Sequence, residues 1–129
     1  MTVPPTVSSH IAETIREDHL RLAVLLDLIQ DDMAAAQPVG PRLAQLRMEF
    51  ERHANREEEV LARFEPETLE SHRRGHDRMR ILLHSVSARY DGGHDIGELL
   101  AQVVGMFTGQ LMPADGVFTG PTTPSTTAR

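Results

Sequence analysis

Apolar residues recur every three or four positions through four stretches of this 129-residue chain, and segments containing Pro or Gly separate the stretches. This spacing places the apolar side chains along one face of an α-helix, which has 3.6 residues per turn. No stretch alternates apolar and polar residues over the length of a strand. Four helices with short connections and one apolar face each bury those faces most simply in a bundle. We therefore expect an all-α fold, an antiparallel up-down four-helix bundle.

Residues that cap or break helices set the expected helix ends. Ser8 or Ser9 can cap a first helix that runs to about Ala36, where "AQPVGP" breaks the chain. Pro41 suits the first turn of a second helix, which "FEPE" separates from a third. After "DGGHD", Asp95 is expected to begin a capping box at the start of the fourth helix.

Each expected helix has one face that would contact the rest of the bundle. The residues on these faces are Ile15, His19, Leu22, Leu26, Ile29 and Met33; then Leu43, Leu46, Phe50, His53, Glu57, Val60 and Phe64; then Leu69, His72, His76, Met79, Leu83, Val86 and Tyr90; and finally Leu99 or Leu100, Val103, Phe107 and Gln110. Most of them are aliphatic, so the polar members stand out.

Composition and charge narrow the classes of protein to consider. A formal net charge of -6 argues against nucleic acid or an anionic membrane as the main partner. Without Cys, the chain can form no disulfide, thiolate metal site or cysteine nucleophile. No apolar run approaches the ~18 residues of a membrane span, and the N-terminal residues lack the features of a signal peptide. We expect a cytoplasmic protein that is a monomer or a weak homo-oligomer.

One domain accounts for most of the chain. We expect an N-terminal arm at residues 1–8, the bundle at residues 9–118 and a disordered tail at residues 119–129, which are rich in Pro and Thr.

Five polar residues on the apolar faces are the candidate functional residues: His19, His53, Glu57, His72 and His76. Burying a lone carboxylate costs several kcal/mol unless it is paired, hydrogen-bonded or bound to a cation. Four imidazoles in an aliphatic core would also need many hydrogen-bond partners. One metal centre would satisfy all of these groups, so the pattern indicates metal binding.

The spacing of these residues supports a shared site. His53 and Glu57 are four residues apart, as are His72 and His76, so each pair reaches one point beside its helix. Imidazole and carboxylate ligands suit Fe, Mn, Zn or Cu rather than Ca or Mg. Five ligands exceed the needs of a tetrahedral structural Zn site, so the count favours two ions bridged by a carboxylate.

The other charged residues and histidines near these positions have a simpler interpretation. Within "REEE", residues 56–59, only Glu57 is in phase with the buried face, and we expect the rest to be solvated. His10, His84 and His94 are out of phase or in loops. A single buried His is commonly a hydrogen-bonded core residue, so a bundle without metal remains an alternative.

The ordered set His19, then His53-x-x-x-Glu57, then His72-x-x-x-His76 resembles the hemerythrin and hemerythrin-like (HHE cation-binding) family. "REDHLRLAVLLDLI" and "HANREEEVL" are similar to the first- and second-helix patterns of that family. The resemblance covers about residues 10–118. It implies a centre of two non-haem iron ions (Fe–O–Fe) rather than Zn or Mn. By this resemblance, His19 and His53 would bind one iron, His72 and His76 the other, and Glu57 would bridge them.

The fourth helix departs from the family pattern, which has a His followed by a carboxylate as HxxxxD or HxxxE. In "GQLMPADGVF", Gln110 stands at the position of the His and Asp115 at the acid position of the longer form; in the shorter form Ala114 would replace the acid. We include Gln110 and Asp115 among the metal ligands, although Gln110 could instead be a polar residue at a helix end. An amide is a poorer iron ligand than imidazole, so the second iron is expected to bind more weakly.

The resemblance implies a protein that binds O2 or a related small molecule for storage, delivery or sensing. The altered fourth helix favours a first alternative, a di-iron redox enzyme acting on peroxide or nitric oxide. A second alternative is an iron-responsive module whose folding depends on metal. We expect no catalytic residue apart from the ligands, because the chain has no Ser or Cys nucleophile arrangement and no Gly-rich phosphate loop.

Overall fold

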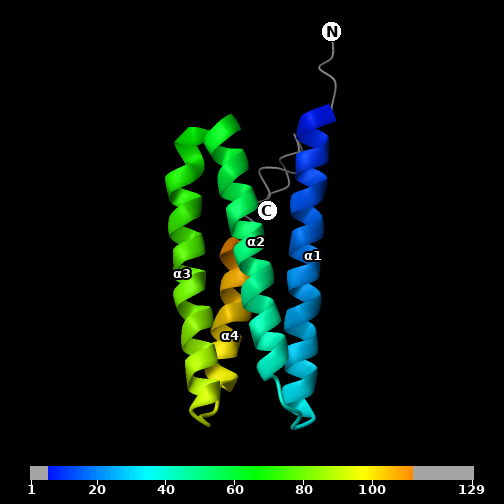
Figure 1. Ribbon diagram of the computed structural model, residues 1–129, viewed down its shortest axis with the longest axis vertical. Coiled ribbons are helices and arrows are strands. Elements are labelled where there is room, and N and C mark those ends of the chain that lie inside the picture. The colour runs from blue at the N-terminus through cyan, green and yellow to red at the C-terminus, as the bar shows by residue number, and fades with distance from the viewer. Residues whose placement is uncertain (1–5, 112–129) are drawn as a thin grey trace.

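The computed structural model describes the backbone of residues 6–111 and the side chains of residues 11–109, and this part of the chain is helical throughout apart from short connections. The elements are α1 (Thr6–Ala34), α2 (Gly40–Phe64), α3 (Pro66–Asp91), α4 (Gly97–Met106) and a π-helical turn η1 (Phe107–Leu111). Successive helices run in opposite directions, and α2 packs against both α1 and α3 while α3 packs against α4 (Figure 1). The predicted all-α, antiparallel bundle is therefore confirmed.

The connections between helices are short. Ala36, in the α1–α2 connection, has a φ of 58°, and Gly93, between α3 and α4, has a φ of 80°. The Val39 N–H donates a hydrogen bond of 3.0 Å to the Tyr90 hydroxyl, which ties the first connection to the end of α3. Both loops lie at the lower end of the molecule in Figure 1, so this bond fixes one end of the bundle.

Some helix ends differ from the sequence predictions. Because α1 begins at Thr6, Ser8 and Ser9 lie within the helix and do not cap it. Pro41 does lie in the first turn of α2, as expected. At α4 the N-cap position is Ile96 rather than Asp95, and the Asp95 carboxylate accepts a 3.3 Å hydrogen bond from the Gly97 N–H. The predicted capping box is thus wrong, although Asp95 still contacts the start of the helix.

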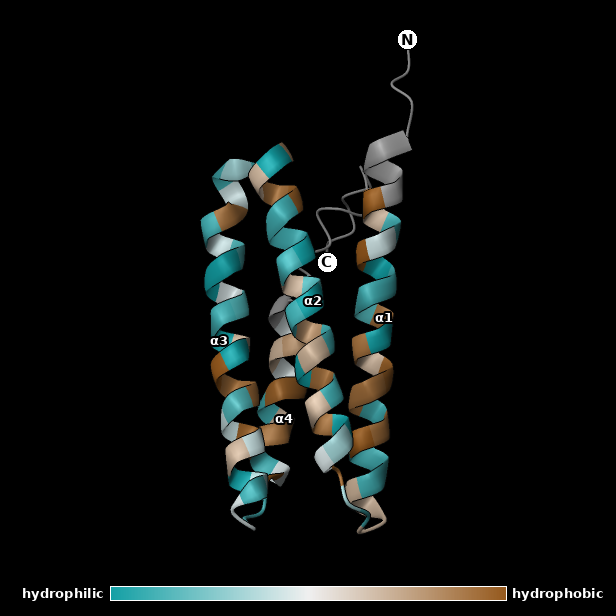
Figure 2. Ribbon diagram, in the orientation of Figure 1, coloured by the Kyte–Doolittle hydropathy of each residue, from teal (hydrophilic) through white to brown (hydrophobic). Residues whose placement is uncertain are grey.

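A core of aliphatic and aromatic side chains occupies the half of the bundle nearest the two loops (Figure 2). Its buried members are Leu22, Leu25, Leu26, Ile29, Val39, Leu43, Leu46, Phe50, Ala54, Met79, Leu83, Val86, Ile96, Leu100, Val103 and Phe107. Full burial of a Leu, Val or Phe side chain contributes about 1.5–3 kcal/mol, so this cluster is the main source of stability. Among the described residues, no helix has the length and apolar character needed to cross a bilayer.

The prediction for the last turns of α2 is partly wrong. Phe64 is 53% exposed, and Leu61 is fully buried in its place. Phe64 is the last residue of α2, and Glu65 alone connects it to α3, so its ring lies beyond the packed part of the bundle. The position four residues after Glu57 is Leu61, and this step continues the buried face.

Candidate metal centre

The polar residues predicted from the sequence lie directly beyond the aliphatic core, on α1, α2 and α3. His19, His53, Glu57 and His76 are each 6% exposed or less. His72 is half-buried. The Phe50 ring lies 6.2 Å from the His53 ring and 5.7 Å from the His76 ring, and the Phe107 ring lies 6.0 Å from that of His19. Two aromatic rings of the core, those of Phe50 and Phe107, therefore lie next to the imidazoles.

Three of these residues bring ligand atoms together. One ligand atom from each of His19, His53 and Glu57 lies within 4.8 Å of the other two. The ring centroids of His19 and His53 are 4.9 Å apart, and His53 Nε2 lies 3.7 Å from Glu57 Oε1. The group joins α1 to α2, and all three residues are buried.

Glu57 also connects this group to α3. The Oε1 atom that faces His53 lies 2.7 Å from His76 Nε2. The ring of His72 lies 6.4 Å from the ring of His76, and its Nδ1 donates a 3.1 Å hydrogen bond to the carbonyl of Thr68. One carboxylate oxygen of α2 thus lies between imidazoles of two different helices.

Comparison with known proteins agrees with this arrangement. The family model of the hemerythrin HHE cation-binding domain matches residues 10–112, which is most of the chain. This chain belongs to the hemerythrin HHE family. No curated protein and no solved structure matches it significantly. The resemblance predicted from the sequence is therefore confirmed, and the protein is a hemerythrin-like cation-binding domain.

The structure also assigns contacts to two carboxylates of this hemerythrin-like domain that the sequence interpretation missed. Asp18 is 5% exposed, and its Oδ2 lies 3.6 Å from His53 Nδ1. Glu58 was expected to be solvated, but it is only 16% exposed, and its Oε2 accepts a 2.8 Å hydrogen bond from His76 Nδ1. Both carboxylates adjoin a candidate ligand in sequence and contact a histidine of another helix.

Arginines surround the Asp18 carboxylate. Arg21 donates a 2.8 Å hydrogen bond to Oδ1, and Arg56 Nε lies 3.1 Å from Oδ2. Burial raises the pKa of Asp18, but the contacts with His53, Arg56 and Arg21 outweigh it, so the net pKa lies below its ordinary value. Asp18 is therefore an ionised acceptor next to His53.

The two candidate ligands of the fourth helix cannot be placed in the same way. The backbone of Gln110 lies in η1, but its side chain is outside the described residues, as is the whole of Asp115. The roles of both remain predictions. Helix α4 changes to a π-helical turn at Phe107, which the sequence did not indicate.

The chemistry of the donors fits a cation in a hemerythrin-like domain. The group offers imidazole nitrogen and carboxylate oxygen, which suit the first-row transition metals. Its donor atoms come from separate helices and converge within 4.8 Å in a buried place, which agrees with a site for one small ion. His76 extends the donor set across Glu57 toward α3.

Proposed function

We propose that this domain binds two non-haem iron ions and, through them, O2 or a related small molecule. The observation that supports this most directly is the position of Glu57. Its Oε1 atom lies 3.7 Å from His53 Nε2 and 2.7 Å from His76 Nε2, although these histidines belong to different helices. A carboxylate between two groups of imidazoles is suited to bridge two ions.

In the proposed ligand set, His19 and His53 bind one iron, His72 and His76 bind the other, and Glu57 bridges them. The convergence of His19, His53 and Glu57 supports the first half of this assignment. The 2.7 Å contact between His76 and Glu57 supports the second half. Gln110 and Asp115 complete the proposed set from the fourth helix.

When bound, a pair of ferrous ions supplies the two electrons needed to take up O2 reversibly. The chain itself holds the donors on rigid helices, which fixes their separation. Phe50 and Phe107 pack against the imidazoles and lower the polarity around them, and such an apolar shell controls solvent access to a metal. These features favour binding and release of a small molecule over exposure of the ions to bulk water.

The sequence of the fourth helix supports a second candidate function, a di-iron enzyme that acts on peroxide or nitric oxide. Gln110 occupies the position at which the family pattern has His, and an amide binds iron less strongly than imidazole does. A weaker ligand at the His72 and His76 side would leave that ion more accessible to a reactant.

Anaerobic titration with Fe(II), followed by exposure to O2, tests the proposal. We expect about two iron ions per chain and an absorption change that reverses when O2 is removed. His76→Ala should lower the iron content, whereas His84→Ala, which removes an exposed histidine of the same helix, should not. Equal iron content in the two variants would contradict the ligand assignment. Rapid turnover of peroxide or nitric oxide without a reversible O2 response would favour the enzyme.

A further inference from the structure

The Nδ1 atoms of two buried imidazoles, those of His53 and His76, face carboxylates that are not in the proposed ligand set. His76 Nδ1 donates a 2.8 Å hydrogen bond to Glu58 Oε2. His53 Nδ1 lies 3.6 Å from Asp18 Oδ2. On the opposite side of each ring, Nε2 faces Glu57 Oε1, at 2.7 Å for His76 and 3.7 Å for His53. Each imidazole therefore lies between an outer and an inner carboxylate.

This orientation decides which ring nitrogen can bind a cation. A neutral imidazole that donates its Nδ1–H keeps its lone pair on Nε2. His72 follows the same rule, since its Nδ1 donates to the Thr68 carbonyl. Metal-binding histidines in proteins almost always donate the other ring N–H to a carboxylate or a backbone carbonyl, which fixes the ring and strengthens the ligand.

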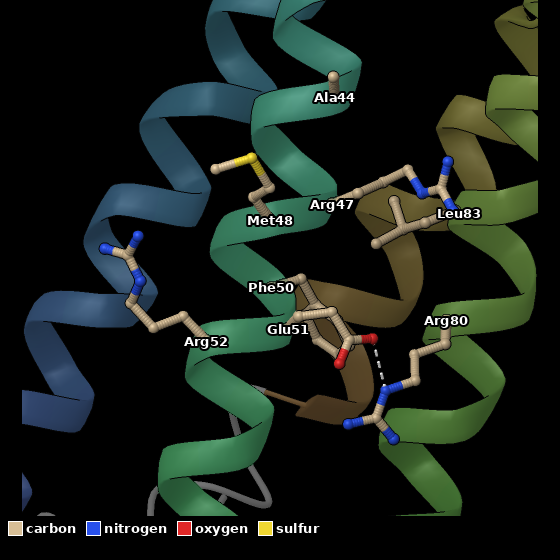
Figure 3. A pocket seen from close by; sticks show the side chains of 8 residues that line it. All are labelled: Ala44, Arg47, Met48, Phe50, Glu51, Arg52, Arg80 and Leu83. Atoms are coloured by element: carbon tan, nitrogen blue, oxygen red, sulfur yellow. Dashed lines mark hydrogen bonds and ion pairs between the residues drawn. The ribbon is translucent and has the colours of Figure 1, made fainter.

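Glu58 is itself held in place by an arginine network. Arg80 reaches from α3 toward α2, where its NH2 lies 3.5 Å from Glu58 Oε2 and its Nε donates a 2.7 Å hydrogen bond to Glu51 (Figure 3). Its NH1 donates a second bond of 2.7 Å to Asp77. These contacts fix the guanidinium beside Glu58, whose carboxylate is turned toward His76.

We propose that Glu58 and Asp18 are positioning residues that hold His76 and His53 with Nε2 directed at the bound cation and increase the donor strength of both imidazoles. This role rests on the proposed function, in which these histidines bind iron. Glu58 has the larger effect on metal affinity, because its contact with His76 is a hydrogen bond of 2.8 Å, whereas Asp18 lies 3.6 Å from His53. The cation they support is a divalent transition metal that accepts nitrogen and oxygen ligands.

Metal affinity measured on paired variants tests this role. Glu58→Ala and Glu59→Ala each remove one negative charge from the same turn of α2, but Glu59 is exposed. By competition with a coloured chelator, Glu58→Ala should bind Fe(II) about 10–100-fold more weakly than the wild type. Glu59→Ala should stay within about twofold, as expected for a charge away from the imidazoles. Asp18→Asn should show a smaller loss than Glu58→Ala.

Glu58→Gln separates positioning from a merely structural role. The Gln side-chain oxygen can still accept the His76 Nδ1–H, so most of the affinity should return, while the loss of charge should leave a measurable deficit. The ¹⁵N shift of His76 Nδ1 in the metal-free protein should be that of a protonated nitrogen in the wild type and in Glu58→Gln. In Glu58→Ala it should move toward that of an unprotonated nitrogen, because the ring then has only Glu57, at Nε2, as a carboxylate acceptor.

Each outcome of these measurements supports or overturns the positioning role of Glu58. If the wild type binds Fe(II) and both Glu58 variants bind it as tightly as Glu59→Ala, the positioning role is overturned and the proposed function stands. If Glu58→Ala does not fold, the affinity and ¹⁵N shifts of Glu58→Gln decide instead. If the wild type binds no transition metal, the proposed function and the positioning role fail together.

Discussion

At the end of the bundle that carries the α1–α2 and α3–α4 loops, the buried side chains of the described residues are aliphatic or aromatic, whereas further along the helices an aspartate, three histidines and a glutamate are buried together. The same helices build both regions. The buried face of α2 begins with Leu43, Leu46 and Phe50, and the next two positions on that face are His53 and Glu57. One amphipathic pattern thus supplies a core in one half and candidate metal ligands in the other.

Burial of side chains contributes differently to the stability of the two halves. Burial of the apolar side chains stabilises the fold whether or not a cation is present. Burial of His53, Glu57 and His76 costs free energy, which their contacts with one another and with neighbouring groups must offset. A bound cation would add further stabilisation to this half. The two halves should therefore respond differently to substitution and to removal of metal.

The largest expected effect belongs to the aliphatic half. Leu46→Ala removes a side chain that is 2% exposed and should lower the free energy of unfolding by about 2–5 kcal/mol. Urea denaturation measures this loss, which should be similar with and without Fe(II). Leu20→Ala is the control, since Leu20 is 63% exposed and its loss should cost less than about 0.5 kcal/mol. If Leu46→Ala lowers the free energy of unfolding only in the presence of metal, the stability of the aliphatic half depends on the polar half.

Removal of the cation should affect the polar half. At a free Fe(II) concentration of 100 times Kd, binding should stabilise the wild type by about 2.7 kcal/mol, and a chelator should abolish this gain. Glu57→Ala, which removes the shared carboxylate, should unfold at the same urea concentration with and without Fe(II). A metal-dependent shift that persists in Glu57→Ala would contradict the bridging role.

A smaller effect is expected from the hydrogen bond between the α1–α2 loop and the end of α3. Tyr90→Phe removes the acceptor of the Val39 N–H and should lower the free energy of unfolding by about 0.5–1.5 kcal/mol. Because this bond lies at the loop end of the aliphatic half, the iron content of the folded variant should be unchanged. Urea denaturation and iron quantitation on one preparation test both statements, and a loss of iron would mean that the two ends are coupled.

The smallest effect should come from the last residue of α2. Phe64→Ser replaces a side chain that is 53% exposed and should change the free energy of unfolding by less than about 0.5 kcal/mol. Thermal unfolding of the two proteins side by side measures the difference. A loss of several kcal/mol would indicate that Phe64 is buried, as the helical period predicted.

The sequence was most informative where a repeat determines the structure. The period of 3.6 residues predicted the burial of His19, His53, Glu57 and His76, because a residue in phase with Leu and Phe neighbours must face the same way. It failed at Phe64, where the helix ends and the period no longer implies contact. It also missed the contacts of Asp18 and Glu58, since these join side chains of different helices that no spacing along one helix encodes.

Anomalous diffraction at the iron edge, from crystals grown anaerobically with Fe(II), would show whether two iron ions lie next to Glu57. We expect two iron peaks on either side of the Glu57 carboxylate, one coordinated by His19 and His53 and the other by His72 and His76. Iron found only at exposed histidines such as His84 and His94, with none next to Glu57, would contradict it.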